Sequence, residues 1–180
     1  ADATVAMAGG DLSAVDAASF TVEVGCAINI GSSAAPLQIQ ATTVTIAGTG
    51  TVYITPNCTT MNVMASGSTY CSSTSTHPTI NHHAGSTQTQ AAITTLLVDG
   101  GVVTHGLAGK TTATVGTATV ENATLYYNST GTLTTANIKT SGTLSGNNCA
   151  GATTITTCNL YKNGRLLDTY NRFILTNGVA

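Results

Sequence analysis

Charged side chains are scarce in this sequence. Asp, Glu, Lys and Arg together make up 7% of the 180 residues, against about 25% in an average globular protein. The five basic and seven acidic residues leave a formal net charge of −2. Binding to nucleic acid by release of counterions needs many basic residues, so this composition excludes it. An ordinary disordered chain is excluded as well, because 42% of the residues are hydrophobic and the mean hydropathy is +0.21.

Long apolar runs and a signal-peptide pattern are also missing from the printed sequence. No segment approaches the roughly 18 consecutive apolar residues of a membrane-spanning helix. The opening residues, ADATVAMAGGD, lack the basic and apolar regions of a signal peptide. We therefore expect a soluble protein without a membrane partner, folded as one unit because its length suits a single core.

Threonine takes the place of charge. The sequence holds 37 Thr and 19 Gly but only three Pro. Thr is β-branched and favours strands, while Gly and Asn favour tight turns. The composition predicts an all-β fold with many corners and no long helices. No two of the five cysteines form a CxxC pair. We interpret most of them as small buried apolar residues: Cys26, Cys58, Cys71, Cys149 and Cys158. Two disulfides, Cys58–Cys71 and Cys149–Cys158, are the alternative.

A repeat in the sequence indicates the architecture. The segments TTANIKTSGTL at 134–144 and TTCNLYKNGRL at 156–166 share Thr-Thr, a small or apolar residue, Asn, an apolar residue and a Gly-containing turn. Further copies begin at 42, 59 and 94, and degenerate copies at 78 and 119. The starts are about 15 to 25 residues apart, the length of one turn of a β-solenoid.

The third and fifth positions of each copy are mostly apolar. Residues two apart on a strand point to the same face, and one turn cannot bury that face without a neighbour. We therefore expect a right-handed parallel β-helix, or β-solenoid, of about six or seven turns over residues 41–180. Its predicted core includes Val44, Ile46, Val63, Leu96, Val98, Ile138 and Leu160. Glycines at the following corners are expected to have φ > 0: Gly48, Gly67, Gly85, Gly100, Gly142 and Gly164. A β-sandwich of short strands is the alternative fold.

The two ends differ from the repeats. Residues 1–18 carry three of the seven acids and no copy of the repeat. We expect residues 1–40 to be an irregular N-terminal arm with attachment strands. Near the other end lie three of the five basic residues, Lys162, Arg165 and Arg172. We interpret this end as a cap on the last turn, with a binding surface as the alternative.

Candidate catalytic residues are few. A glycosidase needs two carboxylates across the scissile bond, and after residue 24 only Asp99, Glu121 and Asp168 are available. We interpret them as solvated turn residues. No G-x-S-x-G motif is present, and His105 has no evident Asp partner. We expect no enzyme, no catalytic residue and no cofactor.

Histidines form the other candidate constellation. His77, His82 and His83 lie in STHPTINHHAGS, and His105 follows. Adjacent strand residues face opposite sides, so His82 and His83 do not share one ion, and His82 takes an inward position of the repeat. We interpret these histidines as polar or partly buried residues. A metal ion held by equivalent histidines at an axis between subunits is the alternative.

The recurring turn TTxNhxxxGxh, where h is apolar, resembles the small Thr- and Gly-rich β-helical structural proteins encoded among the head genes of tailed bacteriophages. The resemblance covers roughly residues 42–175. It implies a virion protein: a capsid decoration, or cement, protein on the outside of the head, trimeric, with the major capsid protein as partner. It implies no catalytic residue.

A receptor- or glycan-binding domain of a tail fibre, spike or surface adhesin is the alternative function. Binding surfaces generally use Trp and Tyr, whereas this chain has no Trp and its six Tyr are scattered along the sequence. The structural role is therefore favoured. A low-charge surface and open strand edges at both ends of a lone solenoid further predict a homo-oligomer, a trimer.

Overall fold

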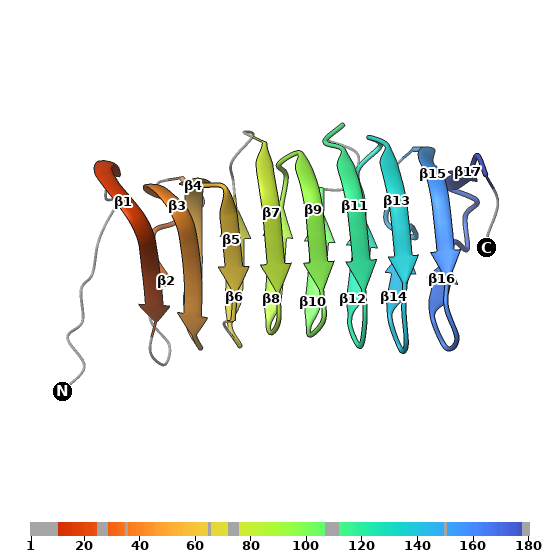
Figure 1. Cartoon of the computed structure of the whole chain (residues 1–180), viewed down its shortest axis with the longest axis horizontal. Coiled ribbons are helices and arrows are strands. Elements are labelled where there is room, and N and C mark those ends of the chain that lie inside the picture. Colours follow the sequence, from red (N-terminus) through yellow and green to blue (C-terminus); the bar gives the residue numbers. More distant parts are fainter. Residues whose placement is uncertain are drawn as a thin grey trace.

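The computed structural model of the chain describes residues 11–24, 29–34, 36–64, 66–71, 76–106, 112–149 and 151–177. These residues form 17 strands and no helix, so none of them belongs to a helix that could cross a membrane. All strand pairs in this part of the chain are parallel, and the strands stack as successive turns (Figure 1). The predicted all-β parallel solenoid is confirmed. The alternative sandwich is wrong, because β-sandwiches are built from antiparallel sheets.

Successive turns each contribute one strand to each of two rows. The first row consists of β1 (Asp11–Val24), β3 (Leu37–Gly48), β5 (Thr60–Val63), β7 (His77–His82), β9 (Ile93–Val98), β11 (Val115–Val120), β13 (Leu133–Ile138), β15 (Thr153–Leu160) and β17 (Phe173–Leu175). The second row consists of β2 (Asn29–Ile30), β4 (Thr51–Asn57), β6 (Ser68–Cys71), β8 (Ser86–Thr89), β10 (Val102–His105), β12 (Thr124–Tyr127), β14 (Thr143–Ser145) and β16 (Arg165–Leu167). Seven two-strand turns, called turns 1 to 7 below, run from β3–β4 to β15–β16.

Equivalent side chains form columns through the interior. On the odd-numbered strands the first inward column is Val44, Met61, Ile80, Leu96, Ala118, Ala136 and Cys158. The second is Ile46, Val63, His82, Val98, Val120, Ile138 and Leu160. The predicted core is confirmed except at Leu160, which is only partly buried. The reason is that β17 pairs with Thr153–Ile155 alone and leaves the end of β15 uncovered by any described strand.

One copy of the repeat is out of register with the prediction. β11 aligns Thr117 with Thr95 on one side and with Thr135 on the other. Gly116 is therefore the equivalent of Thr134, and the copy begins at 116 instead of 119. The first Thr of the motif is replaced by Gly here, which removes the signal that marks the other copies.

The corner glycines serve two purposes. Gly48 and Gly85 have φ of 94° and 73°, as predicted. The expectation of a positive φ is wrong for the other four: Gly67, Gly100, Gly142 and Gly164. At each of these a Cβ atom would collide with a backbone carbonyl oxygen of the preceding turn. Close stacking of turns, and not a left-handed backbone, therefore requires Gly at these corners.

Both ends of the solenoid are described in part. β1 pairs in register with β3 from Ser19–Thr43 to Val24–Gly48, so residues 11–24 of the expected arm add a strand to the first row. The expected boundary at residue 40 falls inside β3, and residues 1–10 lie outside the described residues. At the other end, the Asp168 carboxylate accepts the backbone N–H groups of Arg172 and Phe173 at 2.7 and 2.8 Å. These bonds fix the turn before β17, whose Phe173 side chain packs against the core.

The column register generates a stability prediction at Ile138. This side chain is fully buried between Val120 and Leu160, and Ile138→Asp would place an unpaired carboxylate in the apolar column. Such a change costs about 3 to 5 kcal/mol, so we expect loss of cooperative thermal unfolding followed by circular dichroism. Asn137→Asp, on the outward side of the same strand, is the control and should melt close to the parent. A normal melt of Ile138→Asp would show that the register is wrong.

Candidate functional site

The outward side chains of the odd-numbered strands form an uncharged lattice, here called the Thr/Asn face. Its middle column is Thr in all seven turns: Thr43, Thr60, Thr79, Thr95, Thr117, Thr135 and Thr157. One flanking column is Thr42, Thr59, Pro78, Thr94, Gly116, Thr134 and Thr156. The other is Thr45, Asn62, Asn81, Leu97, Thr119, Asn137 and Asn159. The odd-numbered strands lie side by side in Figure 1, in front of the even-numbered ones. No charged residue interrupts these three columns.

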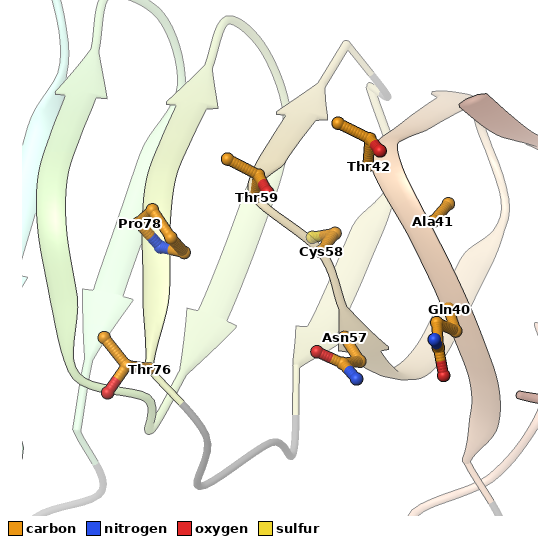
Figure 2. A pocket seen from close by; sticks show the side chains of 8 residues that line it. All are labelled: Gln40, Ala41, Thr42, Asn57, Cys58, Thr59, Thr76 and Pro78. Carbon is orange, nitrogen blue, oxygen red and sulfur yellow. The ribbon is translucent and has the colours of Figure 1, made fainter. Parts of the chain in front are cut away.

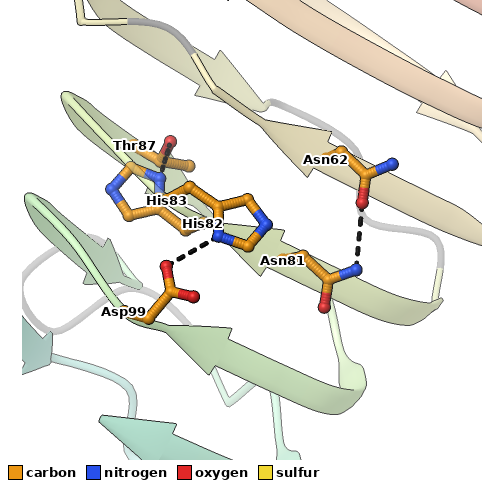
Figure 3. A network of polar contacts seen from close by, with 6 residues as sticks. All are labelled: Asn62, Asn81, His82, His83, Thr87 and Asp99. Atoms are coloured by element: carbon orange, nitrogen blue, oxygen red, sulfur yellow. Dashed lines mark hydrogen bonds and ion pairs between the residues drawn. The ribbon is translucent and has the colours of Figure 1, made fainter. Parts of the chain in front are cut away.

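Amide ladders explain the Asn of the sequence motif. The Asn81 side-chain amide donates to Asn62 Oδ1 at 2.9 Å (Figure 3), and the Asn159 amide donates to Asn137 Oδ1 at 2.8 Å. The spacing of about 4.8 Å between neighbouring strands brings equivalent amides within reach of one another. The Asn side chains therefore bond to one another between turns along this face.

Charged residues lie beside the Thr/Asn face and pair between turns. His83 Nδ1 lies 2.7 Å from Asp99 Oδ1 (Figure 3), and Lys139 Nζ lies 3.9 Å from Glu121 Oε2. All four side chains are more than one-third exposed, so these ion pairs contribute little to stability. With Asp168 engaged in the cap, each of the three candidate carboxylates has a partner of its own.

The structure separates the candidate histidines. His77, His82 and His105 are buried inside the solenoid, at 1%, 0% and 0% exposure, whereas His83 is on the outside. His82 and His83 thus face opposite sides, as predicted. Because His82 is fully buried, it does not reach an axis between subunits, and that alternative is wrong for this residue. Among the residues described, no group of three or more His, Cys, Asp or Glu could hold a metal ion.

The sequence analysis missed a polar stretch of the interior. The inward columns of the even-numbered strands contain Thr69, Thr87 and Thr89, all at most 1% exposed. Thr87 Oγ1 lies 3.3 Å from His82 Nδ1. Apolar alternation could not reveal β8, because Thr87 and Thr89 occupy its inward positions, and Thr69 weakens the pattern of β6 in the same way. The one sequence feature that indicated a polar interior was His82, which occupies an inward position of the repeat.

Burial perturbs the buried titratable groups. Desolvation lowers the pKa of His82 and of His105 to about 4, and it also lowers the pKa of His77. The backbone contacts of His82 with Gly85 and of His105 with Ala113 oppose these changes only in part. The three rings are therefore neutral at pH 7.

Two tyrosines that are distant in the sequence form one outward site. Tyr53 on β4 and Tyr70 on β6 are register partners, and their rings stack with centroids 4.7 Å apart and planes at 10°. Tyr126 lies further along the same outward column, beyond Gln88 and Thr104. The interpretation of the tyrosines as scattered is wrong for this pair. Only the register of the turns reveals the pairing.

A shallow pocket of about 350 Å³ lies beside turns 1 to 3 (Figure 2). Its lining is Gln40, Ala41, Thr42, Asn57, Cys58, Thr59, Thr76 and Pro78. Amide and hydroxyl groups dominate, and no charged group is present in the lining. Such a pocket offers hydrogen bonds to a neutral polar ligand and offers no ionic partner to a phosphate or a carboxylate.

No protein-family description, curated protein or solved structure gives a significant match to this chain.

The cysteines generate a chemical prediction. The four that the structure describes are buried and form no disulfide: Cys58, Cys71, Cys149 and Cys158. The two alternative disulfides are therefore wrong, and Cys26 lies outside the described residues. Burial raises the pKa of Cys58 to about 11, although this residue lines the pocket. Since the thiolate is the reactive form, we expect these four thiols to resist iodoacetamide at pH 7.5 in the native protein and to react after unfolding in guanidinium, as read by mass spectrometry. Rapid labelling of Cys58 in the native protein would contradict its burial and its raised pKa.

Proposed function

We propose that this chain is a non-catalytic structural protein of a virion, a decoration (cement) protein on the outside of a tailed-phage head that acts as a homotrimer bound to the major capsid protein. The observation that carries the proposal is the Thr/Asn face. Solvated protein surfaces normally carry interspersed charges, whereas the cores of protein–protein interfaces are depleted of them. An uncharged face that runs over all seven turns suits packing against other protein chains.

The interior supports a structural role. Buried side chains from Leu37 to Cys158 form one continuous core, so the solenoid is filled along its length. Resemblance of the repeated turn to β-helical phage head proteins supports the specific assignment to a capsid. A filled solenoid provides a stiff body whose faces keep a fixed geometry, as reinforcement of a shell requires.

The N-terminal part is the proposed attachment segment. It contains Asp2, Asp11, Asp16 and Glu23, and no basic residue precedes Lys110. This end of the chain is therefore acidic, while the rest has few charges with which to hold a partner electrostatically.

Rebinding to particles tests the proposal. Virions of the phage that encodes the chain are stripped of it, and purified protein is added back and sedimented with them. We expect the full chain to restore its original occupancy, and a chain that lacks residues 1–10 to bind at least tenfold less while it melts normally, since every described strand is kept. Arg172→Ala, at the opposite end of the solenoid, is the control and should bind like the parent.

The result that contradicts the assignment is a full chain that neither occurs in purified virions nor sediments with stripped ones. Equal binding by the shortened chain would contradict only the attachment segment. The Arg172→Ala variant would then show whether the cap supplies the contact instead.

A second candidate function, glycan binding by a fibre or adhesin domain, is supported by the Tyr53–Tyr70 stack and by the neutral polar pocket. Aromatic rings are enriched at binding surfaces. Binding to a glycan array that is lost in Tyr70→Ala, together with absence of the protein from phage heads, would favour this candidate over the capsid role.

A further inference from the structure

The buried histidines are concentrated in one part of the solenoid. His77 and His82 lie on β7 in turn 3, and His105 lies on β10 in turn 4. The inward column that contains His82 is otherwise apolar, with Ile46 and Val63 before it and Val98, Val120 and Ile138 after it. Among the described residues, turns 3 and 4 are therefore the part of the interior that contains imidazole side chains.

Each of these rings is only partly satisfied. One nitrogen has a neighbour: His77 Nε2 lies 3.6 Å from Cys71 Sγ, His82 Nδ1 lies 3.3 Å from Thr87 Oγ1, and His105 Nε2 lies 3.3 Å from the Ala113 carbonyl oxygen. The other nitrogen of each ring is buried without a partner at hydrogen-bond geometry, and the backbone of Gly85 and Val102 near His82 favours its charged form only in part. A neutral imidazole has one donor nitrogen, whereas an imidazolium donates from both. Protonation would thus add an unpaired donor and a charge to the interior.

Among the residues that the structure describes, no opposite charge lies beside the rings inside the solenoid. The side chains beside them on neighbouring strands are neutral: Val63, Cys71, Thr87, Thr89, Ile93, Val98 and Tyr127. No carboxylate is among the buried polar residues of the described chain. The titratable groups that interact electrostatically with His82 are His83 and Asp99, which pair with each other on the outer surface. A buried imidazolium would therefore remain uncompensated.

We propose that turns 3 and 4 form an acid-labile joint, in which protonation of the buried histidines opens these turns while the flanking turns stay folded. The opening is local because each turn of a solenoid contacts only its neighbours, so that stability is a sum of local contributions. Partly open states of this kind are a general property of folded chains. The step takes up protons from solvent and breaks no covalent bond.

The sign and size of the response follow from the histidine pKa values. A His whose pKa is 6.5 when open and about 4 when buried stabilises the closed state fully above pH 6.5 and loses that contribution as the pH falls toward 4. At pH 5 such a group favours opening by about 30-fold relative to pH 7.5. For His82 and His105 together, the same change of pH raises the opening constant by roughly several hundred-fold.

Hydrogen exchange of the full chain, read by mass spectrometry at pH 7.5 and 5.0 and corrected for the intrinsic exchange rates, tests the joint. We expect the opening constant of peptides within 77–105 to rise at least 30-fold at the lower pH. Peptides within 133–160 serve as the reference inside the same molecule and should change less than threefold. An equal response in both regions, or none in either, would overturn the proposal.

The column itself provides a matched variant. His82 stacks between Val63 and Val98, so His82→Val continues an apolar column. In this variant the rise of the opening constant between pH 7.5 and pH 5.0 should be about 30-fold smaller than in the parent. His83→Gln, the exposed neighbour, is the control and should leave the response unchanged. A full acid response in His82→Val would refute the role of this ring. If that variant does not fold, the comparison of the two regions in the parent chain still decides the proposal.

Discussion

Burial between turns is the constraint on which this structure depends. A single turn exposes its inward side chains on both sides, and only the next turn, stacked in register, covers them while also satisfying the backbone groups through parallel pairing. The same register aligns the outward side chains. Ala136, Asn137 and Ile138 illustrate the result, because two of them continue inward columns while the residue between them continues the amide ladder. Core and surface are thus set by one alignment.

This constraint makes departures local. Replacing an apolar inward residue by His82 affects the turns that touch it, and the columns resume with Val98 on the next strand. Turns 3 and 4 accept three neutral histidines and buried Thr because the apolar columns on either side supply the stability. A solenoid can therefore carry a pH-sensitive interior in its middle and an uncharged Thr/Asn face along its whole outside.

The sequence was informative where one residue pattern coincided with one structural position. The TTxN motif placed the odd-numbered strands and their inward pairs, since apolar alternation and the corner Gly recur together. The strands β6 and β8 were not found, because an inward Thr such as Thr69 cannot be distinguished from an outward one by polarity. Gly116 stands in place of the first Thr of the motif, and the predicted start of that copy was therefore placed at 119 instead of 116. The Tyr53–Tyr70 stack depends on register between turns, which is a property of the folded chain and of no local segment.

Cross-linking across turns tests the stacking register most directly at the copy that diverges. Thr117 and Thr135 are register partners, at a strand spacing of about 4.8 Å that a disulfide spans readily. The double variant Thr117→Cys/Thr135→Cys should form an intramolecular disulfide under mild oxidation, detected by mass spectrometry. The pair Thr117→Cys/Asn137→Cys, offset by two residues along the strand, should not. Efficient cross-linking of the offset pair, or none of the aligned pair, would contradict the register on which the account of core, face and joint depends.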